Sequence, residues 1–458
     1  MFPMQKVSNK NMKNPSSFKK PLIPLYLKKL SDSDFYHYKI GAQLTYLPAY
    51  FYIVNLFNNN PIYLVLAALL TIIITEWNQP NQVYLDSIKQ KSPEDMLLLG
   101  SLLLQLLGFA IWGIQAQFDF FRLVGLHLTF IYYVLARNKQ FIQGRFGIFF
   151  LRDAWRGFWT IPIKNIRLRS QILGHPPLQK SNKSKVNPQF ILTLLGSIGV
   201  AILLVAFAIS QLQAVSQQFK LVTDHWFDQL NAIYFQFSWY DLFIEFLCYA
   251  ILSLPVGAYL YGLLFGPLIR GRKSDESYQA LQEKLNNNRT LPVFSSYIII
   301  GSLCFIYLLF LILGFSDLQA LFQAQTISPQ AASETAVSGF WQLVRVALLN
   351  FTTLAGSYFF VSSPIWDKKI GKLILTCLFA FSLIFALLAA WKLFGIYIYL
   401  FGLTPRRLIS GWFVTVLIVW TLLTLVRLHK PFHSIRIGLF YLIFSFSCLS
   451  YLYAFWID

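Results

Sequence analysis

The sequence has little charge for its length. Only 12% of its 458 residues are Asp, Glu, Lys or Arg, whereas a soluble domain carries about a quarter. Hydrophobic residues make up 56% of the chain, and aromatic residues make up 17%. This shortage of charge argues against a soluble globular protein and favours a chain whose helices are surrounded by lipid.

Cysteine is also scarce, and the cysteines form no recognisable set. Cys248, Cys304, Cys377 and Cys448 each lie inside an apolar stretch, where a free thiol behaves as a small hydrophobic side chain. The chain contains no Cys-x-x-Cys pair and no Cys/His spacing typical of a metal site. We therefore expect no disulfide framework, no metal centre and no cofactor.

The motifs of common enzyme classes are absent as well. The chain has no His-Glu-x-x-His, no Walker lysine loop, no Gly-x-Ser-x-Gly and no Asp-rich pair that would hold magnesium for phosphoryl or prenyl transfer. Its six histidines are scattered, and only His127 lies inside an apolar stretch. The sequence leaves enzymatic activity undecided and favours a non-enzymatic protein.

Long apolar stretches are abundant. A helix needs about 20 mostly apolar residues to cross the roughly 30 Å hydrocarbon core of a membrane, and this chain contains such stretches repeatedly. They predict an all-α, polytopic integral membrane protein with about 11 transmembrane helices. The predicted helices cover residues 40–57, 61–75, 96–114, 121–136, 189–212, 239–266, 291–315, 340–362, 372–391, 409–426 and 437–456.

The connecting segments differ in charge, and this difference predicts how the helices are oriented. All but six of the 38 Lys and Arg residues fall on one side if the N-terminus is cytoplasmic, as the positive-inside rule requires. We therefore predict a multi-pass protein with a cytoplasmic N-terminus and an external C-terminus. Sidedness explains the net charge of +19, so the expected partners are anionic lipid headgroups at the cytoplasmic face and not nucleic acid.

The predicted spans divide the chain into four regions. Residues 1–39 form a basic cytoplasmic tail, 40–136 hold transmembrane helices 1–4, 137–188 form a basic cytoplasmic loop, and 189–458 hold helices 5–11. Within the loop, Phe141–Ile166 interleaves arginines with many aromatic residues. This composition is typical of an amphipathic helix that lies in the membrane interface, so we add one interfacial helix to the predicted fold.

Charged residues in or beside the predicted spans are candidate functional residues, because a charge at the centre of a membrane helix costs roughly 2.5–3.5 kcal/mol on insertion scales. Under the predicted orientation they gather in the outer half of the membrane. Arg345 lies among apolar residues and is interpreted either as half of a structural ion pair with Glu245 or as a binding site for an anionic group. The candidate binding residues are Arg345, Asn350, Arg407, Glu245, Gln342, Arg406 and Asp241.

Two patterns predict local backbone features. Gly262 and Gly266 form a Gly-x-x-x-Gly spacing, which permits close contact between helices. Further along, Gly402 permits a turn, Thr404 can cap the next helix, and Pro405 suits its first position. The second pattern predicts a helix break but does not explain the two arginines that follow it.

The segment Phe401–Arg407 resembles the Tyr-Gly-Leu-Thr-x-x-Arg signature of a bacterial polytopic membrane family known only as a domain of unknown function. Upstream, Ser338–Leu343 and Asn350 resemble the family's Gly-Phe-Phe-Glu-Leu segment and its downstream Asn, so the matches span roughly residues 290–430. Phe401 replaces the family's Tyr, and Gln342 replaces its Glu. The resemblance implies a protein of the bacterial cytoplasmic membrane and brings no established activity.

Three functions remain open. The leading hypothesis is a non-enzymatic membrane protein whose outward-facing polar cavity binds an anionic lipid or envelope component, or that serves as a partner of another membrane protein. A transporter is the second, although transporters usually bind substrate near mid-bilayer between inverted repeats, and the sequence shows no such repeats. The third is a lipid- or glycan-modifying enzyme with Glu245 or His127 as a base, which needs a reaction partner within hydrogen-bond reach.

Overall fold

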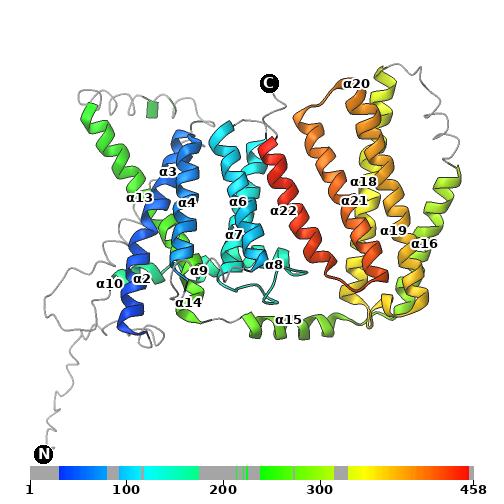
Figure 1. The fold of residues 1–458 in the computed structure, drawn as a ribbon, viewed down its shortest axis with the longest axis horizontal. Helices are drawn as coiled ribbons and strands as arrows, with labels where there is room; N and C mark the ends of the chain where they lie inside the picture. Colours follow the sequence, from blue (N-terminus) through cyan, green and yellow to red (C-terminus); the bar gives the residue numbers. More distant parts are fainter. Residues whose placement is uncertain are drawn as a thin grey trace, which may run out of the picture.

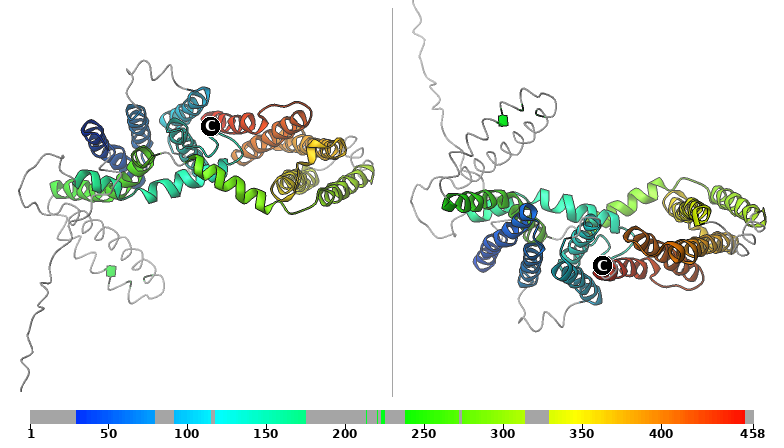
Figure 2. Two further views of the ribbon diagram at one scale, coloured as in Figure 1. Left: turned by 90° about the horizontal axis from the view of Figure 1, so that it is seen from below. Right: turned by 90° about the horizontal axis from the view of Figure 1, so that it is seen from above.

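The computed structural model describes residues 30–79, 92–114, 118–174, 238–271, 274–313 and 329–452, together with positions 213, 220, 223 and 224. The described part is built from helices, and its one β-bridge is the isolated pair Leu291 and Val361. The long helices stand side by side in an elongated row, as Figures 1 and 2 show. The all-α prediction is confirmed for these residues.

The long helices form two groups, which we call the first and second bundles. The first bundle contains α2 (Asp32–Leu44), α3 (Tyr46–Asn58), α4 (Pro61–Trp77), α6 (Pro93–Trp112), α7 (Asp119–Arg137), α13 (Ser238–Leu264) and α22 (Ser434–Leu452). The second bundle contains α16 (Val293–Leu313), α18 (Pro329–Phe360), α19 (Lys369–Ala390), the π-helix Trp391–Ile398, α20 (Tyr399–Phe401) and α21 (Pro405–His429). Their apolar cores are largely separate, and the bundles meet where α21 packs against α22.

Short helices lie across one end of both bundles, which we call the basal end (the lower end in Figure 1). They are α8 (Phe150–Trp155), the π-helix Arg156–Thr160, α9 (Ile161–Lys164), α10 (Leu168–Gly174), α14 (Gly266–Arg270), α15 (Ser274–Asn288) and the 3-10 turn Ile365–Asp367. Helix α15 runs from the first bundle to the second. The opposite end, where α20 lies, is the apical end.

Eight of the described helices are long and apolar enough to cross a membrane. They are Pro93–Trp112, Asp119–Arg137, Phe243–Leu264, Val293–Ile312, Phe340–Phe360, Lys369–Phe401, Pro405–His429 and Ser434–Leu452. The chain is therefore a multi-pass membrane protein by length and composition. Of the eleven predicted spans, 189–212 lies outside the described residues.

The first two predicted spans differ from the structure in detail. The stretch 40–57 is divided between α2 and α3, with a break at Thr45. Pro48 follows this break and has no N–H with which to bond the carbonyl of Leu44, so a continuous helix would lose a hydrogen bond there. The stretch 61–75 is α4, which is apolar but shorter than the eight spanning helices.

The predicted interfacial segment is a helix only from Phe150 onward, since the residues before it form turns. Along the helix, Leu151, Trp155, Trp159 and Ile163 are exposed, and their spacing of four places them on one face. Asp153 lies on the opposite face and is buried against the protein. The helix is thus amphipathic and lies across the basal end (Figure 1); its place in a membrane interface stays a prediction.

Glycines allow this basal layer to approach the first bundle closely, as the Gly-x-x-x-Gly spacing predicted. A Cβ added to Gly262 would lie 2.7 Å from the carbonyl oxygen of Pro162 in α9. At Gly266 it would overlap the side-chain amide of Asn165. Neither position therefore has room for a larger side chain.

The predicted turn at the apical end is present, with one correction. Gly402 has φ +74°, which other residues rarely adopt, and Pro405 begins α21. Thr404 is the N-cap residue, but its side chain makes no capping hydrogen bond. Separately, the carbonyls before the turn are satisfied by Arg407, which donates to the backbone oxygens of Phe401 and Gly402 at 2.7 and 2.6 Å.

Candidate functional site

The structure separates the binding residues that the sequence predicted. Glu245 lies on α13 and Arg345 on α18, and these two helices lie toward opposite ends of the row of helices (Figure 1). The two residues therefore do not form the ion pair that was one interpretation of Arg345. Glu245 is exposed and lies 2.6 Å from the hydroxyl of Tyr249, which donates to it or to Asn58.

Five of the candidates belong to the second bundle: Arg345, Asn350, Arg407, Gln342 and Arg406. Arg345, Gln342 and Arg406 are exposed, whereas Asn350 is fully buried and accepts a hydrogen bond of 2.9 Å from Tyr307. Asp241 lies in the first turns of α13, away from this group.

Arg407 has a clear structural role. Besides its bonds to two carbonyls, its guanidinium lies 4.2 Å from the centre of the Tyr397 ring. That arrangement anchors the turn that the signature-like segment forms. A role in ligand binding for the predicted residues stays a prediction.

His127, a candidate base, is placed by two short contacts within the first bundle. Its Nδ1 lies 2.7 Å from the carbonyl oxygen of Leu123 and its Nε2 lies 3.0 Å from the hydroxyl of Tyr52. A carbonyl only accepts, so Nδ1 carries the proton and Nε2 accepts from Tyr52. His127, Glu245 and Arg345 therefore do not surround one pocket, and the geometry offers no support for an enzyme that uses them together.

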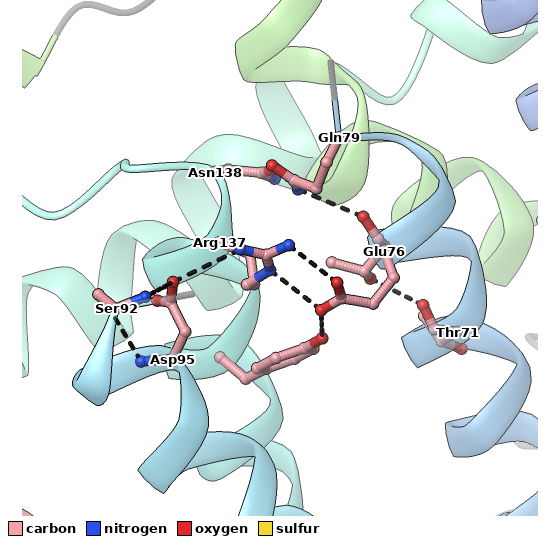
Figure 3. A network of polar contacts seen from close by, with 9 residues as sticks. Thr71, Glu76, Gln79, Ser92, Asp95, Arg137 and Asn138 are labelled. Carbon is pink, nitrogen blue, oxygen red and sulfur yellow. Dashed lines mark hydrogen bonds and ion pairs between the residues drawn. The ribbon is translucent and has the colours of Figure 1, made fainter. Parts of the chain in front are cut away.

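A buried charged network joins three helices of the first bundle at the basal end (Figure 3). Arg137, the last residue of α7, donates to both carboxylate oxygens of Glu76 in α4, at 3.0 and 2.8 Å. The same guanidinium lies 3.5 Å from the carboxylate of Asp95 in α6. Tyr133 donates to Glu76 as well, and Asp95 also caps α6 together with Ser92. We call these residues the Arg137 network.

The chain that leaves α7 beside the Arg137 network is held by further hydrogen bonds. The next residue, Asn138, donates to the backbone carbonyl of Leu264 at the end of α13, at 3.1 Å. The loop that follows is held by Asp153, which accepts from the backbone N–H of Ile142 and from Arg156, both at 3.1 Å. Burial raises the pKa of Asp153 to about 6, because a buried site disfavours the charged carboxylate.

This loop forms one wall of a cavity of about 920 Å³ between the two bundles at the basal end. The other walls are the basal parts of α18, α21 and α22 and the start of α19. The cavity is at the upper end of the volumes usual for ligand sites. It is lined with apolar side chains that include Phe146, Phe351, Leu354, Trp420 and Leu423.

Basic residues surround the same cavity. Arg145, Lys372, Arg427, Lys430 and Arg436 line it, with His429 and His433, against one lining carboxylate, Asp367. Arg436 is paired with Glu94 of α6. No described carboxylate forms a salt bridge with any of the other four. The cavity therefore combines apolar walls with an excess of basic over acidic side chains among the described residues, an arrangement suited to an anionic amphiphile.

Sequence reasoning missed this cavity because it explained these basic residues by membrane sidedness alone. A sequence signal exists: Arg427, Lys430 and Arg436 occur close together with two histidines, where α21 turns into α22. The Arg137 network was missed for a similar reason, although Glu76, Asp95 and Arg137 all adjoin the basal ends of predicted spans. Among the described residues, no group of three or more His, Cys, Asp and Glu is arranged to hold a metal ion.

A comparison with protein families accounts for most of the chain. A model of the family described as Domain of unknown function (DUF4153) matches residues 99–457. The chain belongs to this family. The match includes α7, α13 and the whole second bundle, and thus the walls of the cavity, but not α2, α3 or α4. No curated protein and no solved structure matches the chain.

We expect Arg137→Ala to destabilise the protein strongly, because it leaves the buried carboxylates of Glu76 and Asp95 without their cation. Removing one partner of a buried ion pair costs about 3–5 kcal/mol. Arg152→Ala, which removes an exposed arginine at the same end, is the matched control. Thermal unfolding in detergent should show a much lower midpoint for the first variant alone, and equal midpoints would contradict the assigned role.

Proposed function

We propose that this protein is a non-enzymatic integral membrane protein that binds an anionic lipid in the cavity between its two bundles. The observation that carries the proposal is one cavity that combines apolar walls with basic side chains that form no salt bridge with a described carboxylate. The ligand class is the one expected from the sequence, an anionic lipid or envelope component. Its proposed place is the basal end instead of an outward-facing cavity.

The apolar walls favour a lipid over a small soluble anion. Phe351 and Leu354 of α18 face the cavity together with Trp420 and Leu423 of α21. These residues belong to helices of membrane-spanning length, so an acyl chain along them remains at the depth of the hydrocarbon core. A soluble anion would gain nothing from these walls.

The basic rim favours an anionic headgroup. Arg145 comes from the loop after α7, Lys372 from the first turn of α19, and Arg427 from the last turn of α21. Three separate elements thus bring positive charge to one cavity. Charge-assisted hydrogen bonds from arginine to phosphate are among the strongest in proteins, and they are often bidentate.

We further propose that the basal end faces the cytoplasm of a bacterium and that the protein lies in the cytoplasmic membrane. The basic residues of α8–α10, α14 and α15 all lie at the basal end. The positive-inside rule places such segments in the cytoplasm. The same orientation puts the turn at Gly402 and the end of α22 outside.

We expect the double variant Arg145→Gln, Arg427→Gln to co-purify with less anionic lipid than the wild type. The loss of two charge-assisted bonds should weaken the affinity for the lipid by at least about ten-fold. The measurement is native mass spectrometry of the protein extracted in mild detergent, with bound lipid counted per chain. Both side chains are exposed, so the variant should fold.

The matched control for this experiment is Lys164→Gln, Arg167→Gln. These residues carry the same charge and are exposed at the same end, but they do not line the cavity. The control should retain the lipid of the wild type. Equal lipid in both double variants, with equal unfolding midpoints, would contradict the proposed site.

The proposed orientation predicts opposite labelling of two introduced cysteines in a background without the native ones. Lys430→Cys at the basal end should react with a membrane-impermeant maleimide only after the membrane is opened. Leu403→Cys in the apical turn should react in intact cells. The reverse result would contradict the cytoplasmic placement of the cavity.

Transport of the same ligand is a second candidate function, favoured by one observation. The cavity lies between two bundles with largely separate cores, and many transporters move one bundle against another around a bound substrate. Arg427→Cys distinguishes the two functions. A transporter exposes this position to label from both sides of the membrane, whereas a static lipid site exposes it from the basal side alone.

A further inference from the structure

The positive charge that lines the cavity is larger than a headgroup with a single negative charge would neutralise. Four lining Lys and Arg side chains, Arg145, Lys372, Arg427 and Lys430, form no salt bridge with a described carboxylate. Against them stands one lining carboxylate, that of Asp367. Even with Asp367 counted, the excess positive charge exceeds the single negative charge of a phosphodiester lipid.

Helix α22 adds to this excess. Its first turn, including Ser434 and Arg436, lines the cavity. The N-terminus of a helix carries the positive end of the helix dipole and favours phosphate groups. Arg427 lies in the last turn of α21, where it also offsets the negative end of that helix.

Arg436 differs from the other basic residues that line the cavity, because it has a carboxylate partner within the protein. Its guanidinium is half-buried and paired with Glu94. The other four basic residues reach the cavity from the loop after α7, from α19, and from the end of α21 with the residue that follows it, and the described structure provides no such carboxylate for them. Among the described residues, these four side chains are therefore the ones available to the negative charge of a ligand.

We infer that the ligand's headgroup carries at least two negative charges, as in a phosphate monoester or a diphosphate attached to a hydrocarbon chain. This inference rests on the proposed function and names the chemistry of the same site. A phosphate monoester carries about −1.5 to −2 charge near pH 7 and offers three strong acceptor oxygens. It can thus engage arginines from two walls of the cavity at once, whereas a phosphodiester offers fewer free oxygens and one charge.

The test compares two lipids that differ only in the headgroup. Phosphatidic acid and phosphatidylglycerol with identical acyl chains are each titrated onto the purified full chain in detergent and counted by native mass spectrometry. We expect phosphatidic acid to bind at least about ten-fold more tightly, which corresponds to one additional charge-assisted bond. Inorganic phosphate, added as a competitor, should displace it only weakly because it lacks the chain.

Paired variants assign the preference to the cavity. In the variant Arg427→Gln, Lys430→Gln, the ratio of the affinity for phosphatidic acid to that for phosphatidylglycerol should fall toward one. Lys368→Gln, Lys369→Gln should preserve it, because these exposed residues lie at the same end but do not line the cavity. Unfolding midpoints equal to that of the wild type show that each variant is folded.

The outcomes separate this inference from the proposed function. Equal binding of the two lipids, still weakened by Arg427→Gln, Lys430→Gln, overturns the doubly charged headgroup and leaves anionic-lipid binding intact. Binding of both lipids that no cavity variant changes overturns both. Displacement by inorganic phosphate at the lipid's own affinity overturns the requirement for a hydrocarbon chain.

Discussion

The buried guanidinium of Arg137 is the interaction on which the arrangement of the basal end depends. It satisfies two carboxylates, Glu76 and Asp95, that come from different helices of the first bundle. A charge buried without its partner is costly, by several kcal/mol. The three helices α4, α6 and α7 are therefore fixed relative to one another at the end where the chain leaves the bundle, and a shift of any one would leave a charge unpaired.

Further contacts connect the Arg137 network to the walls of the cavity. Asn138 ties the end of α7 to the end of α13, and Asp153 holds the loop that carries Arg145. On the other side, Trp420 of α21 donates to the backbone of Gly438 in α22 at 2.9 Å. Helix α15 also crosses between the bundles: its Tyr278 lies against Phe149, and Arg289, the residue after the helix, lies against Tyr358. The cavity lies among these attachments, so its walls come from both bundles.

Much of the fold could be predicted from the sequence because lipid imposes a simple rule. A helix in hydrocarbon must satisfy its own backbone and present apolar side chains for its whole length, so stretches such as 372–391 and 409–426 are visible in the sequence. Gly402 and Pro405 likewise mark a helix break through their own backbone preferences. The division of 40–57 at Thr45 was not predicted, because hydropathy does not record the missing N–H of Pro48.

The candidate site could not be predicted in the same way. Its walls are distant in the sequence, and contacts between the bundles, such as the packing of α21 against α22, bring Arg145 and Arg427 to one cavity. Their positive charge was visible, but membrane sidedness explained it without any site. Conversely, Glu245 and Arg345 stood out because each lies among apolar residues, yet they belong to different bundles. Hydropathy locates a charge along the membrane normal but not within the plane of the membrane.

The most direct test of this account is an experimental structure of the full chain in a lipid bilayer disc made with anionic lipids. The account predicts density for one lipid in the cavity, with its phosphate near Arg145 and Arg427 and its chain along Trp420 and Leu423. A cavity closed by movement of the two bundles onto each other, or one that contains only water between these side chains, would contradict it.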